Sequence, residues 1–270
     1  MKPTIDLPTP YYADEAATLY QADALAVLAA LPTASVDALI TDPPYSSGGM
    51  VRSDRTVKST DKSYVRSDSP NMLLGGVPGD SRDQRGWGYW VSLWLSESTR
   101  VLKPGGVALI FTDWRQLPTA TDALQAGGYV WRGIVPWHKP GAFPQSGRFA
   151  HSCEYVIWGT NGARSYGDHG FALPGFFEGR APRDREHMTQ KPLDVMRSLC
   201  SIVPKHGVIL DLFAGSGTTG VASVMNGCKF IGVELTEHYA EVAANRLRTV
   251  DRGYRDDGQQ AALNLDGIAQ

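Results

Sequence analysis

The sequence has 270 residues, is 42% hydrophobic and carries a formal net charge of −2, a composition that predicts one globular domain over 1–270. This charge excludes a polybasic protein, so any affinity for nucleic acid must come from a local basic surface. Three scattered cysteines and the lack of any apolar run near the ~20 residues of a membrane span lead us to expect no disulfide framework, no metal, no membrane partner and a cytoplasmic location.

Chain order begins with three predicted elements that lead into a proline-rich corner. They are a strand at 18–22, a helix at 23–31 and an apolar strand at 36–41. The third runs directly into Asp42-Pro43-Pro44-Tyr45. The composition then changes to Ser, Gly, Asp, Arg and Lys without apolar periodicity, which predicts a long mobile loop over 46–86.

The rest of the chain alternates strands and helices. The predicted segments are a helix at 90–101, a strand at 107–111, a helix at 119–126, strands at 131–138 and 155–158, a helix at 193–202, a strand at 207–213, a helix ending at 226, a strand at 229–234 and a helix at 237–249. The stretch 140–186 is otherwise Gly- and Arg-rich and irregular. This alternation predicts an α/β fold with a doubly wound, mostly parallel sheet.

A glycine-rich turn follows the strand at 207–213, with glycines at 215, 217 and 220. Its spacing fits a dinucleotide fingerprint, and Glu234 at the end of the next strand suits a ribose diol. The carboxylate of Asp211, inside the strand, would attract a cationic sulfonium and repel a pyrophosphate. Phe213 offers an apolar contact. These two residues favour S-adenosylmethionine, while an NAD-dependent oxidoreductase remains the alternative.

The corner at residues 42–45 has the residue types needed to methylate an exocyclic amine. The lone pair of such an amine is delocalised into the ring, and acceptors for both N–H groups would free it for attack. Asp42 can accept one hydrogen, and a carbonyl of the rigid pair Pro43-Pro44 can accept the other. Tyr45 can stack on a base removed from the helix. A catalytically silent DNA-binding protein is a further alternative, in which Asp42 has no role.

Several ordered blocks resemble the β class of amino-DNA methyltransferases. They are 20–45, the VLKPGG block at 101–106, the HMTQKP block at 187–192, and DLFAGSGTTG at 211–220 with IGVEL at 231–235. The resemblance covers most of 18–248 and implies a Rossmann-like sheet of seven strands. It further implies that this sheet is circularly permuted so that the catalytic half comes first, with a small irregular target-recognition insertion at 140–186.

The resemblance also assigns roles to individual residues. Catalysis would rest on Asp42, Pro43, Pro44 and Tyr45, and Lys191 would lie near the methionine carboxylate. The residues implied to contact S-adenosylmethionine are Asp23, Ala24, Asp42, Thr189, Lys191, Asp211, Phe213, Ala214, Gly215, Ser216, Gly217, Thr218, Thr219 and Glu234. An Asp at position 42, where the cytosine group more typically has Ser, favours N6 of adenine over N4 of cytosine.

Double-stranded DNA is the expected substrate, and the base must be flipped out to reach this corner. We expect phosphate and base contacts from the loop and from the target-recognition region. The candidate residues are Arg52, Lys58, Lys62, Arg66, Arg148, Arg164 and Arg183. Because the recognition region is short, a homodimer is a further expectation.

Overall fold

A single mixed sheet forms the centre of the computed structural model, which describes residues 6–45, 82–141, 146–147, 149–165, 172–180 and 191–250. In spatial order its strands are β1 (Tyr12–Ala13), β2 (Ala17–Gln21), β9 (Lys229–Glu234), β8 (Val208–Asp211), β3 (Val36–Thr41), β4 (Leu102–Thr112), β6 (Cys153–Thr160), β5 (Val130–His138) and β7 (Phe177–Glu178). β1 and β6 run antiparallel to their neighbours, and the other pairings are parallel. The predicted mostly parallel sheet is confirmed, with two-residue strands added at both edges.

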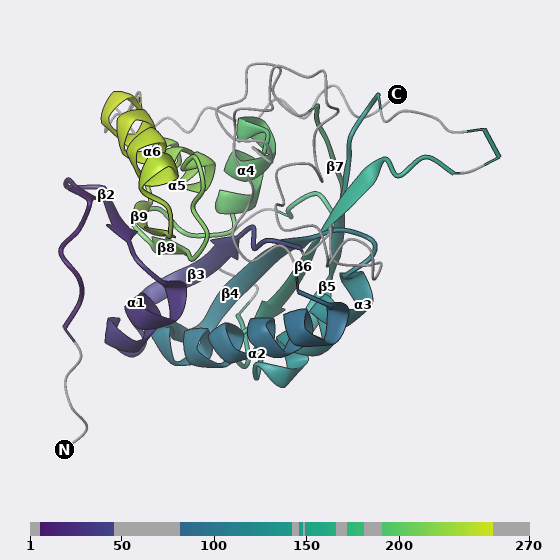
Figure 1. The fold of residues 1–270 in the computed structure, drawn as a ribbon, viewed down its shortest axis with the longest axis horizontal. Helices are drawn as coiled ribbons and strands as arrows, with labels where there is room; N and C mark the ends of the chain where they lie inside the picture. The colour runs from purple at the N-terminus through teal and green to yellow at the C-terminus, as the bar shows by residue number, and fades with distance from the viewer. Residues whose placement is uncertain are drawn as a thin grey trace.

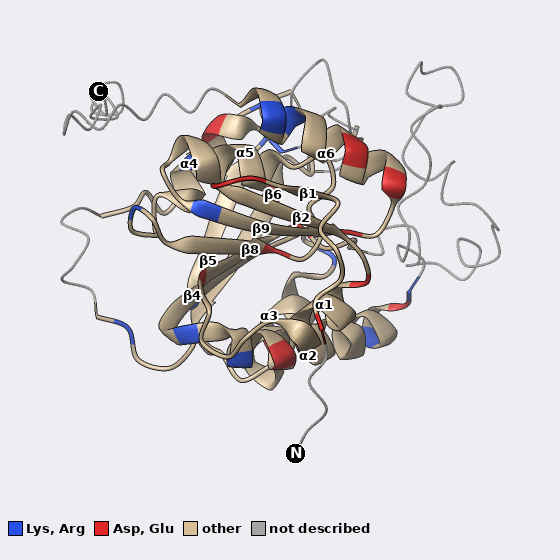
Figure 2. Ribbon diagram, turned by 90° about the vertical axis from the view of Figure 1, so that its left-hand side faces the viewer, with Lys and Arg blue, Asp and Glu red and all other residues tan. Residues whose placement is uncertain are grey.

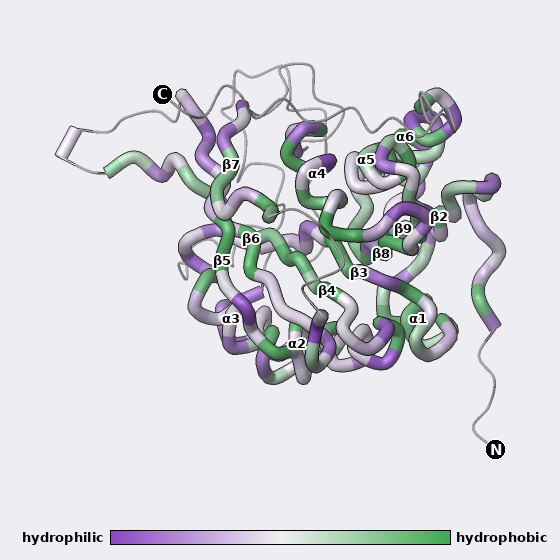
Figure 3. Tube along the Cα trace, turned by 180° about the vertical axis from the view of Figure 1, so that it is seen from behind, coloured by the Kyte–Doolittle hydropathy of each residue, from purple (hydrophilic) through white to green (hydrophobic). Residues whose placement is uncertain are grey.

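Helices cover both faces of this sheet (Figure 1). One layer consists of α1 (Ala24–Ala30), α2 (Gln84–Val101) and α3 (Leu117–Ala126), and the other of α4 (Leu193–Cys200), α5 (Thr218–Met225) and α6 (Glu237–Thr249). β3 shows why both layers form: Leu39 packs with the first layer, whereas Ala38 and Ile40 pack with the second. Successive strand residues point to opposite faces, so a strand buried on both must be apolar throughout, as the green tubes of the central strands show (Figure 3).

Two predicted boundaries differ most from the structure. α2 begins at Gln84 rather than 90, so the end of the predicted loop 46–86 belongs to a helix that Asp83 caps through a 2.8 Å bond from the Gly86 amide. Glycines in its first turns hid the helical period. β4 begins at Leu102 rather than 107 and includes the Lys-Pro-Gly-Gly segment. The segment does not end the strand, and its pairing with β3 only shifts in register there. Residues 46–81 lie outside the described part of the chain.

Within 140–186 the predicted strand at 155–158 is confirmed as the longer β6, and the two-residue β7 was not predicted. Arg164, a predicted DNA contact, donates to the carbonyls of Gly105 (3.1 Å) and Ile202 (3.2 Å). Both carbonyls lie near the amino ends of strands, at the edge opposite Asp42. This position gives Arg164 a packing role and argues against the predicted contact with DNA.

On α6 the acidic residues lie toward the start of the helix and the arginines lie in its last turn (Figure 2), the arrangement that complements a helix dipole. No helix within the described ranges is long and apolar enough to cross a membrane.

Candidate active site

The two sequence motifs lie on adjacent parallel strands. β3 pairs with β8 through Leu39 opposite Leu210, so both strands end at the same edge of the sheet. There the Thr41 hydroxyl donates a 2.7 Å hydrogen bond to Asp211, and Asp42 is the next residue. Ligands of open α/β sheets bind beyond the carboxyl ends of the strands. The corner after β3 and the glycine turn after β8 therefore face one shared site.

Hydrogen bonds from α2 and from the residue before α3 fix the catalytic corner. The indole N–H of the buried Trp87 donates to the Pro44 carbonyl at 2.7 Å. The side-chain amide of Gln116 donates to the Tyr45 carbonyl at 2.9 Å. Proline supplies no N–H and fixes φ, so these two bonds complete a rigid segment. The sequence analysis did not identify Trp87 or Gln116, because neither belongs to a local motif.

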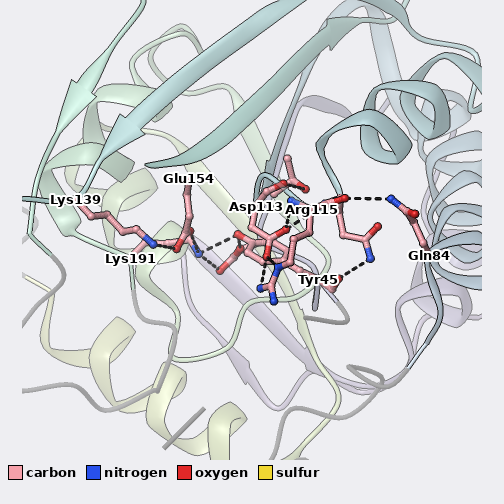
Figure 4. A network of polar contacts seen from close by, with 10 residues as sticks. Tyr45, Gln84, Asp113, Arg115, Lys139, Glu154 and Lys191 are labelled. Atoms are coloured by element: carbon pink, nitrogen blue, oxygen red, sulfur yellow. Dashed lines mark hydrogen bonds and ion pairs between the residues drawn. The ribbon is translucent and has the colours of Figure 1, made fainter. Parts of the chain in front are cut away.

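Lys191 lies at this corner, and its predicted contact with a methionine carboxylate stays a prediction. Its ammonium is 2.8 Å from Asp42 Oδ2, 3.0 Å from the Tyr45 hydroxyl and 3.0 Å from Glu154 Oε2. Lys139 binds the other oxygen of Glu154 at 2.7 Å, and Tyr45 donates to Asp42 Oδ1. Figure 4 shows Lys139, Glu154, Lys191 and Tyr45 in one continuous network. Two carboxylates and two ammonium groups thus balance in charge.

Burial and these partners shift the ionisation of the network. Burial raises the pKa of Asp42, and the Lys191 ammonium offsets part of this rise. Burial also acts against the charge of Glu154, but the ammonium groups of Lys191 and Lys139 bring its pKa down to about 2. Burial opposes the charge of Lys191, yet Asp42 and Glu154 outweigh it and raise its pKa. Lys191 therefore keeps its proton, and all of its N–H donors, at neutral pH.

The glycine turn is shaped by backbone that only glycine adopts easily. Gly217 is the N-cap of α5, with φ of 78°, and an added Cβ would lie 2.9 Å from the Cβ of Ala243 in α6. Glu234, at the end of β9, accepts a 3.0 Å bond from the Gly215 amide and bonds of 2.9 and 2.7 Å from the amide and hydroxyl of Thr236. These bonds orient the Glu234 carboxylate at the turn and leave it further acceptor capacity for a ligand.

Asp211 is a buried carboxylate beneath this turn. It accepts hydrogen bonds from the Thr41 hydroxyl, the Phe213 amide at 3.0 Å and the Thr219 hydroxyl. Burial nevertheless raises its pKa to about 6, and the nearby charge of Asp42 adds to this rise. A cationic ligand beside Asp211 would stabilise its ionised form.

The remaining predicted cofactor residues have two kinds of surroundings. Arg246 of α6 binds the side chains of Ser216 and Thr218, each at 3.0 Å, so these hydroxyls stabilise the turn. Phe213 packs against Trp90 and Trp94 of α2, with ring centroids 5.3 and 5.5 Å away, and stays partly exposed. Asp23 caps α1 through the amides of residues 25 and 26, with Ala24 beside it. Thr189 lies outside the described residues.

Comparison with known proteins decides the family. A family model described as a DNA methylase, N6_N4_Mtase, matches residues 36–245. The chain belongs to this family of amino-DNA methyltransferases. It is accordingly an S-adenosylmethionine-dependent DNA methyltransferase, and the NAD-dependent oxidoreductase is set aside.

Relatives and solved structures agree with this assignment. The Type II methyltransferase M2.LlaDCHI of Lactococcus lactis subsp. cremoris is 29% identical over 259 residues, covering 88% of this chain and 91% of that protein. M2.DpnII of Streptococcus pneumoniae is 28% identical over 266 residues, covering 88% and 92%. The M1.HpyAVI–SAM complex aligns with a TM-score of 0.60 at 24% identity, covering 86% of this chain and 98% of that chain. The cytosine-N4-specific PvuII DNA methyltransferase aligns with a TM-score of 0.66 at 16% identity, covering 92% and 91%. These two structures share the methyltransferase fold, while the circular permutation stays a prediction.

The residues present fit the cofactor of this methyltransferase. β2, β9 and β8 are neighbours, and Asp23, Glu234 and Asp211 lie at or just after their carboxyl ends. S-adenosylmethionine carries a sulfonium, an ammonium and a ribose diol, all of which a carboxylate can bind. Gly215 and Gly217 have left-handed backbone and no side chain. A ligand can therefore approach the backbone of the turn closely in the space between these carboxylates. The donor and acceptor set therefore matches the cofactor.

Proposed function

We propose that this methyltransferase transfers a methyl group from S-adenosylmethionine to N6 of adenine in a base flipped out of double-stranded DNA. The observation that supports methylation of an amine is that Asp42, directly after β3, lies at the edge of the sheet that also holds Asp211. The choice of adenine is supported by the Asp at position 42, where the cytosine group more typically has Ser. S-adenosylmethionine supplies an electrophilic methyl group when it is bound. The chain's own residues must hold the amine and free its lone pair.

The geometry distinguishes between the two proline carbonyls. Trp87 already donates to the Pro44 carbonyl, whereas no described group donates to that of Pro43. We therefore assign one amine hydrogen to Asp42 Oδ1 and the other to the Pro43 carbonyl. Both acceptors draw the nitrogen toward a tetrahedral geometry, and the Asp42 carboxylate stabilises the positive charge that develops on nitrogen during attack. Tyr45 must release Asp42 Oδ1, which frees its ring to stack on the base.

Binding of the cofactor is assigned to the edge formed by β2, β9 and β8. Glu234 would hold the ribose hydroxyls, Asp211 would face the methionine portion, and Phe213 would contact the adenosine or the methionine chain. Asp23 and Ala24 would lie on the far side of the same surface. The turn from Ala214 to Thr219 would contribute backbone, and the assignment of Thr189 stays a prediction. Lys191, at the corner, is proposed to contact the target base instead.

Contacts to DNA are proposed for basic residues outside the described ranges. They are Arg52, Lys58, Lys62, Arg66, Arg148 and Arg183. A homodimer also stays a proposal. Loss of binding with rising salt, measured for the wild type and for a variant with four of these residues changed to glutamine, tests the assignment.

Nucleoside analysis by mass spectrometry tests the target atom. Duplex DNA lacking methylated bases is treated with enzyme and cofactor, and we expect N6-methyladenine. N4-methylcytosine would refute the adenine assignment and support the alternative that the same clamp serves. Asp42→Ala is the matched control: methyl transfer should be lost while S-adenosylhomocysteine still raises the melting temperature. Unchanged transfer by this variant would remove Asp42 from the mechanism.

A further inference from the structure

Three oxygens surround the ammonium of Lys191. A lysine ammonium carries three N–H groups, and three oxygens lie within 3.0 Å of this one: Asp42 Oδ2, Glu154 Oε2 and the Tyr45 hydroxyl. The side chain is only 5% exposed, and its ammonium lies 5.0 Å from the ring centroid of Phe111 and 5.8 Å from that of Trp137. Its position is therefore set by contacts on several sides.

Only one of these three partners must leave when a base binds. The Tyr45 hydroxyl bonds both Asp42 Oδ1 and Lys191, so a base amine at Oδ1 has to displace it. This step rests on the proposed function, in which Asp42 accepts an amine hydrogen. Displacement frees two groups at once: an acceptor site on Asp42 and one N–H of Lys191. Because the ammonium is 2.8 Å from Asp42, these two groups lie side by side.

We propose that Lys191 reads the target base by donating this freed N–H to the ring nitrogen next to the exocyclic amine. In adenine this acceptor is N1, and in cytosine it is N3. Asp42 and Lys191 then present an acceptor and a donor to a base edge that offers a donor and an acceptor. Guanine and thymine offer the reverse pattern, with a carbonyl beside a ring N–H. Their carbonyl would face the acceptor Asp42, and their ring N–H would face the donor Lys191. Asp42 and Lys191 therefore reject guanine and thymine.

Glu154 acts here as a positioning residue. Asp42 alone could neutralise Lys191, but one contact would let the ammonium follow the carboxylate wherever it moved. The ion pair with Glu154 gives Lys191 a second anchor on β6, and Lys139 holds the other oxygen of Glu154 at 2.7 Å. The raised pKa of Lys191 fits this role, because a deprotonated amine would have one donor fewer and could accept a hydrogen bond instead.

The test replaces one ring atom of the base and one side chain of the enzyme. The duplex carries the sequence that the wild type methylates, with adenine, 1-deazaadenine or 3-deazaadenine at the target. We expect kcat/KM of the wild type to fall about 10- to 100-fold on 1-deazaadenine, the range of one hydrogen bond to a charged donor. Lys191→Met should lose activity on adenine and show no further loss on 1-deazaadenine. The 3-deaza substitution should affect both enzymes equally.

Lys139→Met is the matched control, because it removes a lysine of the same network that does not contact Asp42. It should keep the penalty for 1-deazaadenine. The proposal is overturned if the wild type methylates 1-deazaadenine as well as adenine, or if Lys191→Met shows the full wild-type penalty. Should Lys191→Met be inactive, Kd values for the same duplexes with S-adenosylhomocysteine present decide by the same criteria. If the product is N4-methylcytosine, the assignment of adenine as the target is wrong, but the role proposed for Lys191 is still open to test. The same experiment is then done with 3-deazacytosine at the target position.

Discussion

Asp211→Asn should make the methyltransferase more stable at neutral pH while weakening its cofactor site. The Asp211 carboxylate is fully buried, with 1% exposure, and its pKa in the folded protein is about 6 against an ordinary 3.8. The native state therefore resists ionisation of this group, whereas the unfolded chain ionises freely. Asparagine keeps the shape and removes the charge. Its amide oxygen can still accept from Thr41 and Phe213, and the Thr219 hydroxyl can turn to accept from the amide nitrogen.

The size and the pH window follow from the same two pKa values. A rise from 3.8 to about 6 corresponds to about 3 kcal/mol of destabilisation once Asp211 is fully ionised. Well below pH 3.8 the group is protonated in both states and this cost vanishes, and it grows as pH rises toward 6. The free energy of unfolding of Asp211→Asn should therefore exceed that of the wild type by about 1–3 kcal/mol at pH 8. The gain can fall below 3 kcal/mol because the variant loses some charge-assisted hydrogen bonding. The difference between the two proteins should shrink as pH falls toward 4.

Urea unfolding at pH 4, 6 and 8 measures this difference. Asp23→Asn is the control, because Asp23 is an exposed carboxylate at the same edge and asparagine caps a helix equally well. Its stability should follow the wild type at every pH. In binding, Asp211→Asn should lose more affinity for the cationic S-adenosylmethionine than for the neutral S-adenosylhomocysteine. A constant stability difference between pH 4 and 8, or an Asp211→Asn protein less stable at pH 8, would refute the reasoning.

Three further predictions concern the corner and the turn. Trp87→Phe keeps most of the buried ring but loses the 2.7 Å bond to the Pro44 carbonyl, so kcat should fall about tenfold with KM for the cofactor unchanged; an unaltered kcat would show that this bond is dispensable. Tyr45→Phe keeps the stacking ring and frees Asp42 Oδ1, so it should retain activity, whereas Tyr45→Ala should lose 10-fold or more in DNA kcat/KM; equal losses would contradict the stacking role. Gly217→Ala should destabilise by more than the ~1–2 kcal/mol expected for its φ of 78° alone, because its Cβ meets Ala243; Gly162→Ala, with φ of 75° and open space, measures the backbone cost by itself in thermal unfolding.

Much of the fold could be predicted because its signals are local. The apolar run at 36–41 and the glycine turn after β8 each announce an element within a few residues, and both elements are present. Predictions failed where local signals conflicted. The glycines at 86 and 88 concealed the first turns of α2, and the Lys-Pro-Gly-Gly segment resembled a break although it continues into β4.

Sequence alone determined which residue types carry the chemistry, because an acid and two prolines after a strand, or glycines before a helix, are contiguous. Only the tertiary structure decided which distant side chains join them. Lys191 contacts Tyr45 across 146 positions, and Trp87 contacts Pro44 across 43. Glu154 lies one residue before the predicted strand at 155–158 and was assigned no role, and only the fold shows that β6 places it at the ammonium of Lys191. Contacts of this kind depend on the order of the strands and on burial, because a buried charge is stable only when an opposite charge pairs with it. Neither the strand order nor the burial can be inferred from the residues adjacent in sequence.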